Sequence, residues 1–85
     1  MAYSDKPKEA IQLGVRLHKE RISAGLNQTE CAKIGGVNRR TQLAYEQGDS
    51  LPDALYLLRL HQFKGGEHRI DIFYVVTGER AKPIK

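Results

Sequence analysis

The chain has 85 residues, which is enough for one domain to fold without disulfides or metal ions. It has 14 Lys and Arg against 10 Asp and Glu, and the net charge of +4 permits an anionic partner without requiring one. No stretch approaches the ~20 apolar residues of a membrane span, and the first ten residues lack the apolar segment of a signal peptide. The single cysteine, Cys31, excludes an internal disulfide and fits a reducing cytoplasm. We therefore expect residues 1–85 to form a single cytoplasmic domain.

The first predicted helix covers residues 8–24. Its apolar positions recur with a 3.6-residue period on two adjoining stripes, and Gly25 marks its end. The first stripe consists of Ile11, Val15, His18 and Ile22, and the second of Ala10, Gly14, Leu17 and Arg21.

A second, shorter helix is predicted at 28–34. Asn27 followed by Glu30 has the spacing of a capping box, in which each side chain bonds the other residue's backbone N–H. Gly35 and Gly36 then end the helix in a turn of about four residues.

The third predicted helix, at 39–47, opens with two adjacent arginines. Asn38 is a favourable N-cap, and Gly48 ends the helix. The amino end of a helix carries the positive end of its dipole, where cations are mildly unfavourable. Arg39 and Arg40 are therefore either solvated or placed to meet an anion.

Two more helices are predicted, at 52–63 and 72–76. Pro52 suits the first turn of the former, and Asp53 suits the positive end of its dipole. Asp71 can cap the latter, although its sequence IDIFYVV is equally compatible with a strand. The leucines expected in the core are Leu55, Leu57, Leu58 and Leu60.

Residues 28–47 match the helix-turn-helix pattern, with two short helices, glycine in the turn and a polar, basic start to the second helix. A recognition helix lies in the DNA major groove with its amino-terminal residues toward the base edges. Arginine there can bond guanine O6 and N7 together. No acidic residue lies between Glu30 and Glu46, and the basic residues in that interval are Lys33, Arg39 and Arg40.

The sequence from residue 11 to residue 80 resembles the lambda-type phage repressor and Cro family, also called the XRE-like helix-turn-helix family. The resemblance implies an all-α, five-helix DNA-binding domain and a sequence-specific transcriptional regulator, more narrowly a phage- or prophage-type repressor. We expect a homodimer on a palindromic duplex-DNA operator, because one recognition helix covers only a few base pairs. The motifs that carry the resemblance together are Gly25-Leu26-Asn27-Gln28, Ala32, Gly36-Val37, Tyr45-Glu46 with Gly48, and Thr77-Gly78-Glu79-Arg80.

The resemblance also implies roles for individual residues. Gln28 matches a family glutamine that bonds a DNA phosphate and braces the recognition helix, and Lys33 is expected to contact phosphate as well. Arg21 and Glu46 match an ion pair that ties the first helix to the third. The residues expected to contact bases are Arg39, Arg40, Asn38, Ala44 and Thr41.

Two positions depart from the family pattern. Gln42 stands where most relatives have isoleucine or valine, and a buried amide without partners would cost ~1–3 kcal/mol. We therefore expect it to bond a partner, for which Gln28 and a backbone carbonyl are candidates. Cys31 falls where relatives carry leucine, which predicts a small buried hydrophobic side chain.

The sequence gives no reason to expect an enzyme, a cofactor or a metal. It has no glycine-rich phosphate loop, no nucleophile with a base and no clustered carboxylates. The histidines that show no ligand spacing with Cys31 or with one another are His18, His61 and His68.

Two alternative functions keep the fold. One is an antitoxin or a restriction–modification controller that acts with a protein partner, and the other is an interaction module that has lost DNA binding. Phe73 and Tyr74 are expected either in the core or in a dimer seam, and the seam is assigned to the last helix and the tail. That basic tail, 79–85, is expected to be mobile, with Lys82 and Lys85 solvated.

Overall fold

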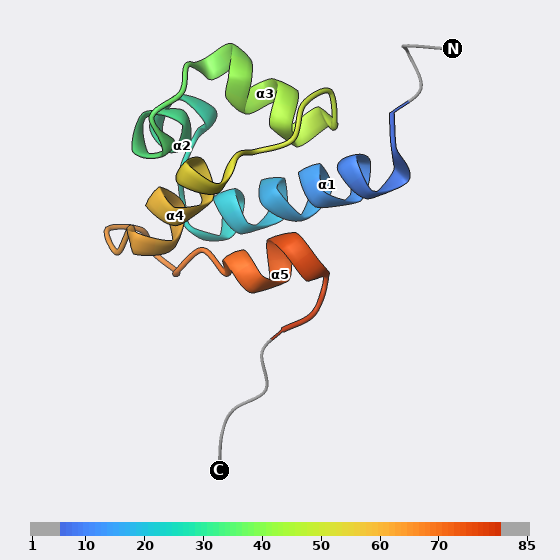
Figure 1. The fold of residues 1–85 in the computed structure, drawn as a ribbon. Helices are drawn as coiled ribbons and strands as arrows, with labels where there is room; N and C mark the ends of the chain where they lie inside the picture. Colours follow the sequence, from blue (N-terminus) through green and yellow to red (C-terminus); the bar gives the residue numbers. More distant parts are fainter. Residues whose placement is uncertain (1–5, 81–85) are drawn as a thin grey trace.

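The computed structural model describes residues 6–80, which form five helices around one core (Figure 1). The predicted all-α class is confirmed, and within the segment IDIFYVV residues 72–76 are helical rather than a strand. No helix among the described residues is long and apolar enough to cross a membrane. The helices are α1 (Lys8–Ser23), α2 (Gln28–Gly35), α3 (Arg39–Gln47), α4 (Ala54–Gln62) and α5 (Ile72–Thr77).

Side-chain caps fix where most of these helices begin. The predicted capping box of α2 is present, since Asn27 Oδ1 accepts from Glu30 N and Glu30 Oε1 from Asn27 N, both at 2.8 Å. Asp53 is the N-cap of α4, where its Oδ1 accepts from Tyr56 N at 2.9 Å. The helix therefore begins two residues later than the position of Pro52 predicts.

Helix α1 separates α3 from α5, which pack on opposite sides of it (Figure 1). Of the two predicted stripes, the second is buried, whereas Ile11, Val15 and Ile22 of the first are about half exposed. The reason lies at Gly14, where a Cβ atom would come within 2.5 Å of the carbonyl oxygens of Tyr45 and Glu46. The missing side chain lets the end of α3 approach α1, and this approach decides which stripe is enclosed.

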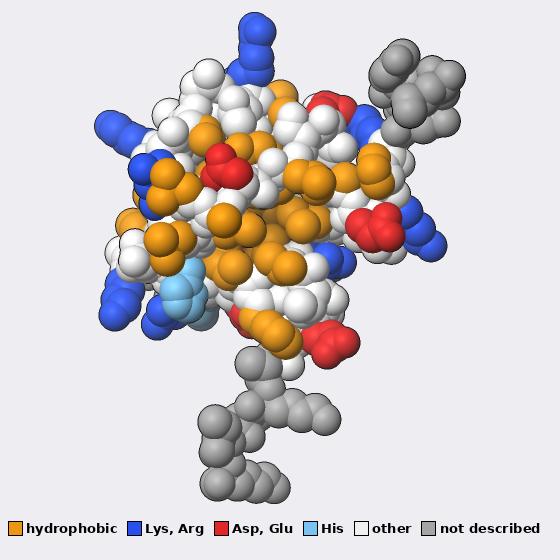
Figure 2. All heavy atoms as spheres, in the orientation of Figure 1, with side chains coloured by type: hydrophobic (Ala, Val, Ile, Leu, Met, Phe, Trp, Pro, Cys, Tyr) orange, Lys and Arg blue, Asp and Glu red, His pale blue; other side chains and the backbone are white. Residues whose placement is uncertain are grey.

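Helix α4 is apolar around most of its circumference and buries one face. Leu60 is fully buried and Leu57 packs against the core, but Leu55 and Leu58 are 51% and 47% exposed. The prediction that nearly all of the four leucines are core was wrong for these two, because Tyr56 fills the core on this helix. Figure 2 shows hydrophobic side chains gathered on the face formed by α4, α1 and α5.

Polar contacts from α1 hold α5 and the segment after it in place. The buried Glu20 carboxylate accepts from Asp71 N at 2.8 Å and from Arg80 Nη2 at 2.9 Å. Arg80 also pairs with Asp71 and lies 3.9 Å above the ring of Tyr74. The tail was predicted to be mobile from residue 79, but the hydrogen bonds to Glu20 and Asp71 fix Arg80 against the fold. Residues 81–85, with Lys82 and Lys85, lie outside the described residues.

Gly14→Ala is expected to destabilise the fold by about 1–3 kcal/mol, because the methyl group collides with backbone rather than with a movable side chain. The loss should appear as a lower urea midpoint with an unchanged slope. Gln12→Ala on the exposed side of α1 is the control and should change stability by less than about 0.5 kcal/mol. A Gly14→Ala protein as stable as the wild type would contradict the close approach of α1 and α3.

Candidate nucleic-acid interface

The turn between α2 and α3 is made by residues 36–38, one fewer than predicted, because α2 extends to Gly35. Gly36 has φ +78°, a left-handed conformation that favours glycine, and Val37 N donates to Ala32 O at 2.9 Å. Val37 packs against the core. The turn thus holds α3 at a fixed angle to α2.

The amino end of α3 presents two exposed arginines. Asn38 Oδ1 accepts from Thr41 N at 2.8 Å, so the predicted N-cap is in place. Arg39 and Arg40 are exposed, and within residues 6–80 neither makes a side-chain hydrogen bond or an ion pair. Their guanidinium groups are therefore available to an anion from outside the chain.

The predicted base-contact residues are distributed around α3. At 100° per residue, Arg40 and Ala44 lie opposite the buried Gln42 and Tyr45, whereas Arg39 and Thr41 lie on the two flanks. Gln47 shares the outer face with Arg40 and Ala44 and is exposed. Sequence reasoning missed Gln47, although its position three residues after Ala44 places it on that face.

The two predicted phosphate-contact residues lie on α2. Lys33 is exposed. Gln28, the first residue of the helix, is half-buried, and its Nε2 lies 3.5 Å from Glu46 Oε1 on α3. This is the outer limit of a hydrogen bond, so Gln28 bridges the two helices and keeps hydrogen-bonding capacity to spare.

The ion pair expected between Arg21 and Glu46 is present and almost completely buried. Arg21 Nε donates to Glu46 Oε2 at 2.7 Å and Nη2 donates to Oε1 at 3.1 Å, with both side chains about 5% exposed. Arg21 Nη1 also donates to Leu26 O at 2.8 Å. His18 Nδ1 lies 3.0 Å from Glu46 Oε1, at the solvent edge of the pair. A two-bond pair of this kind ties the end of α1 to the last turn of α3.

Gln42 is fully buried, and its partners differ from those expected. Its Oε1 accepts from the Tyr56 hydroxyl at 2.6 Å, and its Nε2 donates to Glu46 Oε2 at 2.7 Å. Neither Gln28 nor a backbone carbonyl takes part in these two bonds. The correct partner, Tyr56, lies 14 residues away on another helix and carries no local sequence signal.

These contacts shift the acidity of the Glu46 carboxyl group. Burial by itself would raise its pKa, but hydrogen bonds from Arg21, Gln42 and His18 outweigh burial and lower the pKa to about 2. Glu46 is therefore a carboxylate throughout the neutral range, and its oxygens lie within hydrogen-bond distance of four side chains, those of Arg21, Gln42, His18 and Gln28.

Cys31 is fully buried, as predicted, and burial raises the pKa of its thiol. It therefore packs as a neutral side chain under the turn. In the part of the chain that the structure describes, no three His, Cys, Asp or Glu side chains are grouped so as to hold a metal ion.

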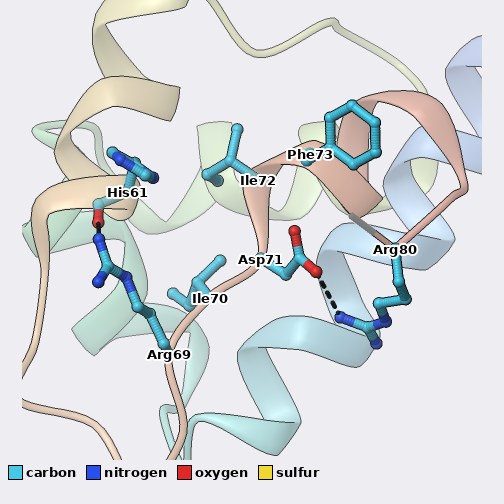
Figure 3. A pocket seen from close by; sticks show the side chains of 7 residues that line it. All are labelled: His61, Arg69, Ile70, Asp71, Ile72, Phe73 and Arg80. Atoms are coloured by element: carbon cyan, nitrogen blue, oxygen red, sulfur yellow. Dashed lines mark hydrogen bonds and ion pairs between the residues drawn. The ribbon is translucent and has the colours of Figure 1, made fainter. Parts of the chain in front are cut away.

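A pocket lies on the opposite side of α1 from α3, where α4 ends and α5 begins (Figure 3). Both arginines that line the pocket already have hydrogen-bond partners. Arg69 donates to the His61 carbonyl, and Arg80 pairs with Asp71. Phe73 stands at this pocket and is 49% exposed, so it is not a core residue of the single chain. The pocket is separate from the helix-turn-helix.

Comparison with known proteins shows which solved structures share this fold. A scan against protein-family models found no match, and a search of curated proteins found none. Among solved structures, the chain is similar to the restriction-modification controller protein C.AhdI from Aeromonas hydrophila, with TM-score 0.59, 24% identity and coverage of 62% of this chain and 80% of that one. It is also similar to the clp gene regulator ClgR from Corynebacterium glutamicum in two structures, with TM-scores of 0.66 and 0.65.

The two ClgR structures are 20% and 21% identical to the chain, and the matches cover 87% and 89% of this chain and 78% and 97% of those chains. The predicted lambda-repressor-like arrangement of five helices is thereby confirmed. The descriptions of these proteins name a controller and a gene regulator, and neither describes an enzyme.

The lowered pKa of Glu46 predicts an acid-sensitive fold. The unfolded chain takes up the proton first as the pH falls, so the stabilisation is complete above about pH 4.5 and is lost toward pH 2. The loss should amount to about 3 kcal/mol of unfolding free energy. Urea unfolding between pH 2 and pH 6 measures it, and Glu46→Gln should remove this component. Equal pH slopes for both proteins would contradict the role given to the carboxylate.

Proposed function

We propose that this protein is a sequence-specific, duplex-DNA-binding transcriptional regulator without enzymatic activity. The observation that carries the proposal is the pair of exposed arginines at the amino end of α3, which make no side-chain hydrogen bond or ion pair with residues 6–80. A buried ion pair holds this helix in place. An amino-terminal helix end with free cationic side chains suits the phosphates and guanine edges of a major groove. The fold shared with C.AhdI and ClgR supports the same reading.

The residues divide into those that read bases and those that set the register. Arg40 lies on the outer face of α3 and is assigned to guanine, together with Arg39 from the flank. Ala44 can touch a thymine methyl, and Gln47 extends the same face with an amide suited to adenine. Asn38 and Thr41 share the cap at the start of α3 and are assigned secondary base contacts.

Gln28 and Lys33 are assigned to phosphates, which fix orientation without choosing sequence. Gln28 suits this role because its contact with Glu46 couples a bound phosphate to α3. The exposed charge of Lys33 on the neighbouring turn adds attraction that does not depend on sequence.

We further propose a homodimer on a palindromic operator, with α5 in the seam. Phe73 and Val76 of α5 are exposed, and α5 lies on the opposite side of α1 from α3, so a seam there leaves α3 free. A phage- or prophage-type repressor is the narrower role that the sequence resemblance implies. The similarity to C.AhdI favours a second candidate, a restriction–modification controller.

Selection from a randomised duplex library by the purified protein at ~150 mM salt tests the function, because non-specific contacts are weakened there. We expect enrichment of a palindrome containing guanines, with half-sites about one helical turn, ~34 Å, apart. No enriched sequence would contradict the proposed function and favour the interaction module without DNA binding. A single half-site would contradict the homodimer alone.

Arg40→Ala is expected to weaken binding to the selected duplex by about 1–3 kcal/mol and to relax preference at one base pair, because one guanine contact is lost. Binding to a panel of single-base variants measures both effects. Arg69→Ala, on the loop before α5, removes the same charge away from α3 and is the control. Gln28→Ala should instead weaken all sequences equally. A uniform loss for Arg40→Ala would show that Arg40 contacts only phosphate.

A further inference from the structure

Tyr56 of α4 touches both helices of the helix-turn-helix. Toward α2, its ring packs on Gly35, where any Cβ atom would collide with ring carbons, and its hydroxyl lies 3.7 Å from Cys31 Sγ. Toward α3, the hydroxyl donates to Gln42 Oε1 at 2.6 Å, and the ring meets that of Tyr45 edge-on with centroids 4.8 Å apart. The whole side chain is buried, with 1% exposed.

The contact to α3 is directional as well as close. Gln42 and Tyr45 are buried residues of α3, and Tyr56 contacts both. Burial raises the pKa of Tyr56, so its hydroxyl stays protonated and must donate. Gln42 therefore turns its oxygen to Tyr56 and its nitrogen to Glu46, since the reversed amide would set oxygen against the carboxylate. An isoleucine or valine at position 42 would pack here without fixing a direction.

We propose that Tyr56 is a positioning residue for DNA recognition. It holds α2 and α3 against α4 and sets how far α3 extends from the surface of the domain, and it does not contact DNA itself. The inference rests on the proposed DNA-binding function. The distance between the phosphate contacts on α2 and the base contacts at the start of α3 has to match the groove for both to form at once. Tyr56 holds that distance through one ring and one hydroxyl.

Tyr56→Phe tests the hydroxyl while keeping the ring in its place against Gly35 and Tyr45. Tyr45→Phe is the matched control, because it removes a hydroxyl from the same pair of rings and that hydroxyl makes no hydrogen bond with any residue from 6 to 80. The measurement is the ratio of affinities for the selected duplex and for a scrambled duplex, at a temperature where circular dichroism shows each protein folded.

We expect Tyr56→Phe to lower this ratio about fivefold or more, the effect of one lost hydrogen bond, mainly by weakening the selected duplex. Tyr45→Phe should keep the wild-type ratio. A lower melting temperature for Tyr56→Phe with an unchanged ratio would overturn the positioning role and leave a structural one. Wild-type protein that does not distinguish the two duplexes would overturn the proposed function instead.

A further measurement separates the positioning role from stability. Amide hydrogen exchange without DNA gives a readout independent of function. Tyr56→Phe should speed exchange in α2 and α3 more than in α1 and α5, and uniform acceleration would count against the positioning role.

Discussion

The Glu46 carboxylate holds α3 to the rest of the fold. It accepts hydrogen bonds from Arg21 of α1 and Gln42 of α3, and through Gln42 it connects to Tyr56 of α4. A buried charge is costly unless its bonding capacity is filled. Each donor therefore has to stay in place, and the angle of α3 is specified more tightly than apolar packing alone would require.

This requirement explains why a glutamine occupies an apolar position of the helix. Gln42 presents a donor to the carboxylate and an acceptor to the Tyr56 hydroxyl, which no aliphatic side chain can do. Among the described residues, every fully buried side-chain nitrogen and oxygen has a partner. The polar core is thus complete, and loss of one member leaves its neighbours unsatisfied.

Two adjacent residues of α1 serve the two sides of the molecule. Arg21 points toward α3 and pairs with Glu46, whereas Glu20 points toward α5 and accepts from Asp71 N and Arg80. Both are about 5% exposed, yet they are fastened to different parts of the chain. Under the proposed function, α1 thereby separates the surface that meets DNA from the surface assigned to a second copy.

The sequence by itself determined the first four helices, because caps such as Asn27 with Glu30 and the ends at Gly36 and Gly48 are local interactions. It left the segment IDIFYVV open between a helix and a strand, and the structure shows a helix at Ile72–Thr77. It also placed Arg39 and Arg40 at an exposed helix start, and their DNA contacts remain predictions. Only the tertiary structure decided which stripe of α1 is enclosed, which leucines of α4 face outward and which hydroxyl satisfies Gln42. Those outcomes depend on contacts between residues far apart in the chain, and hydrophobic periodicity carries no information about which helix lies opposite.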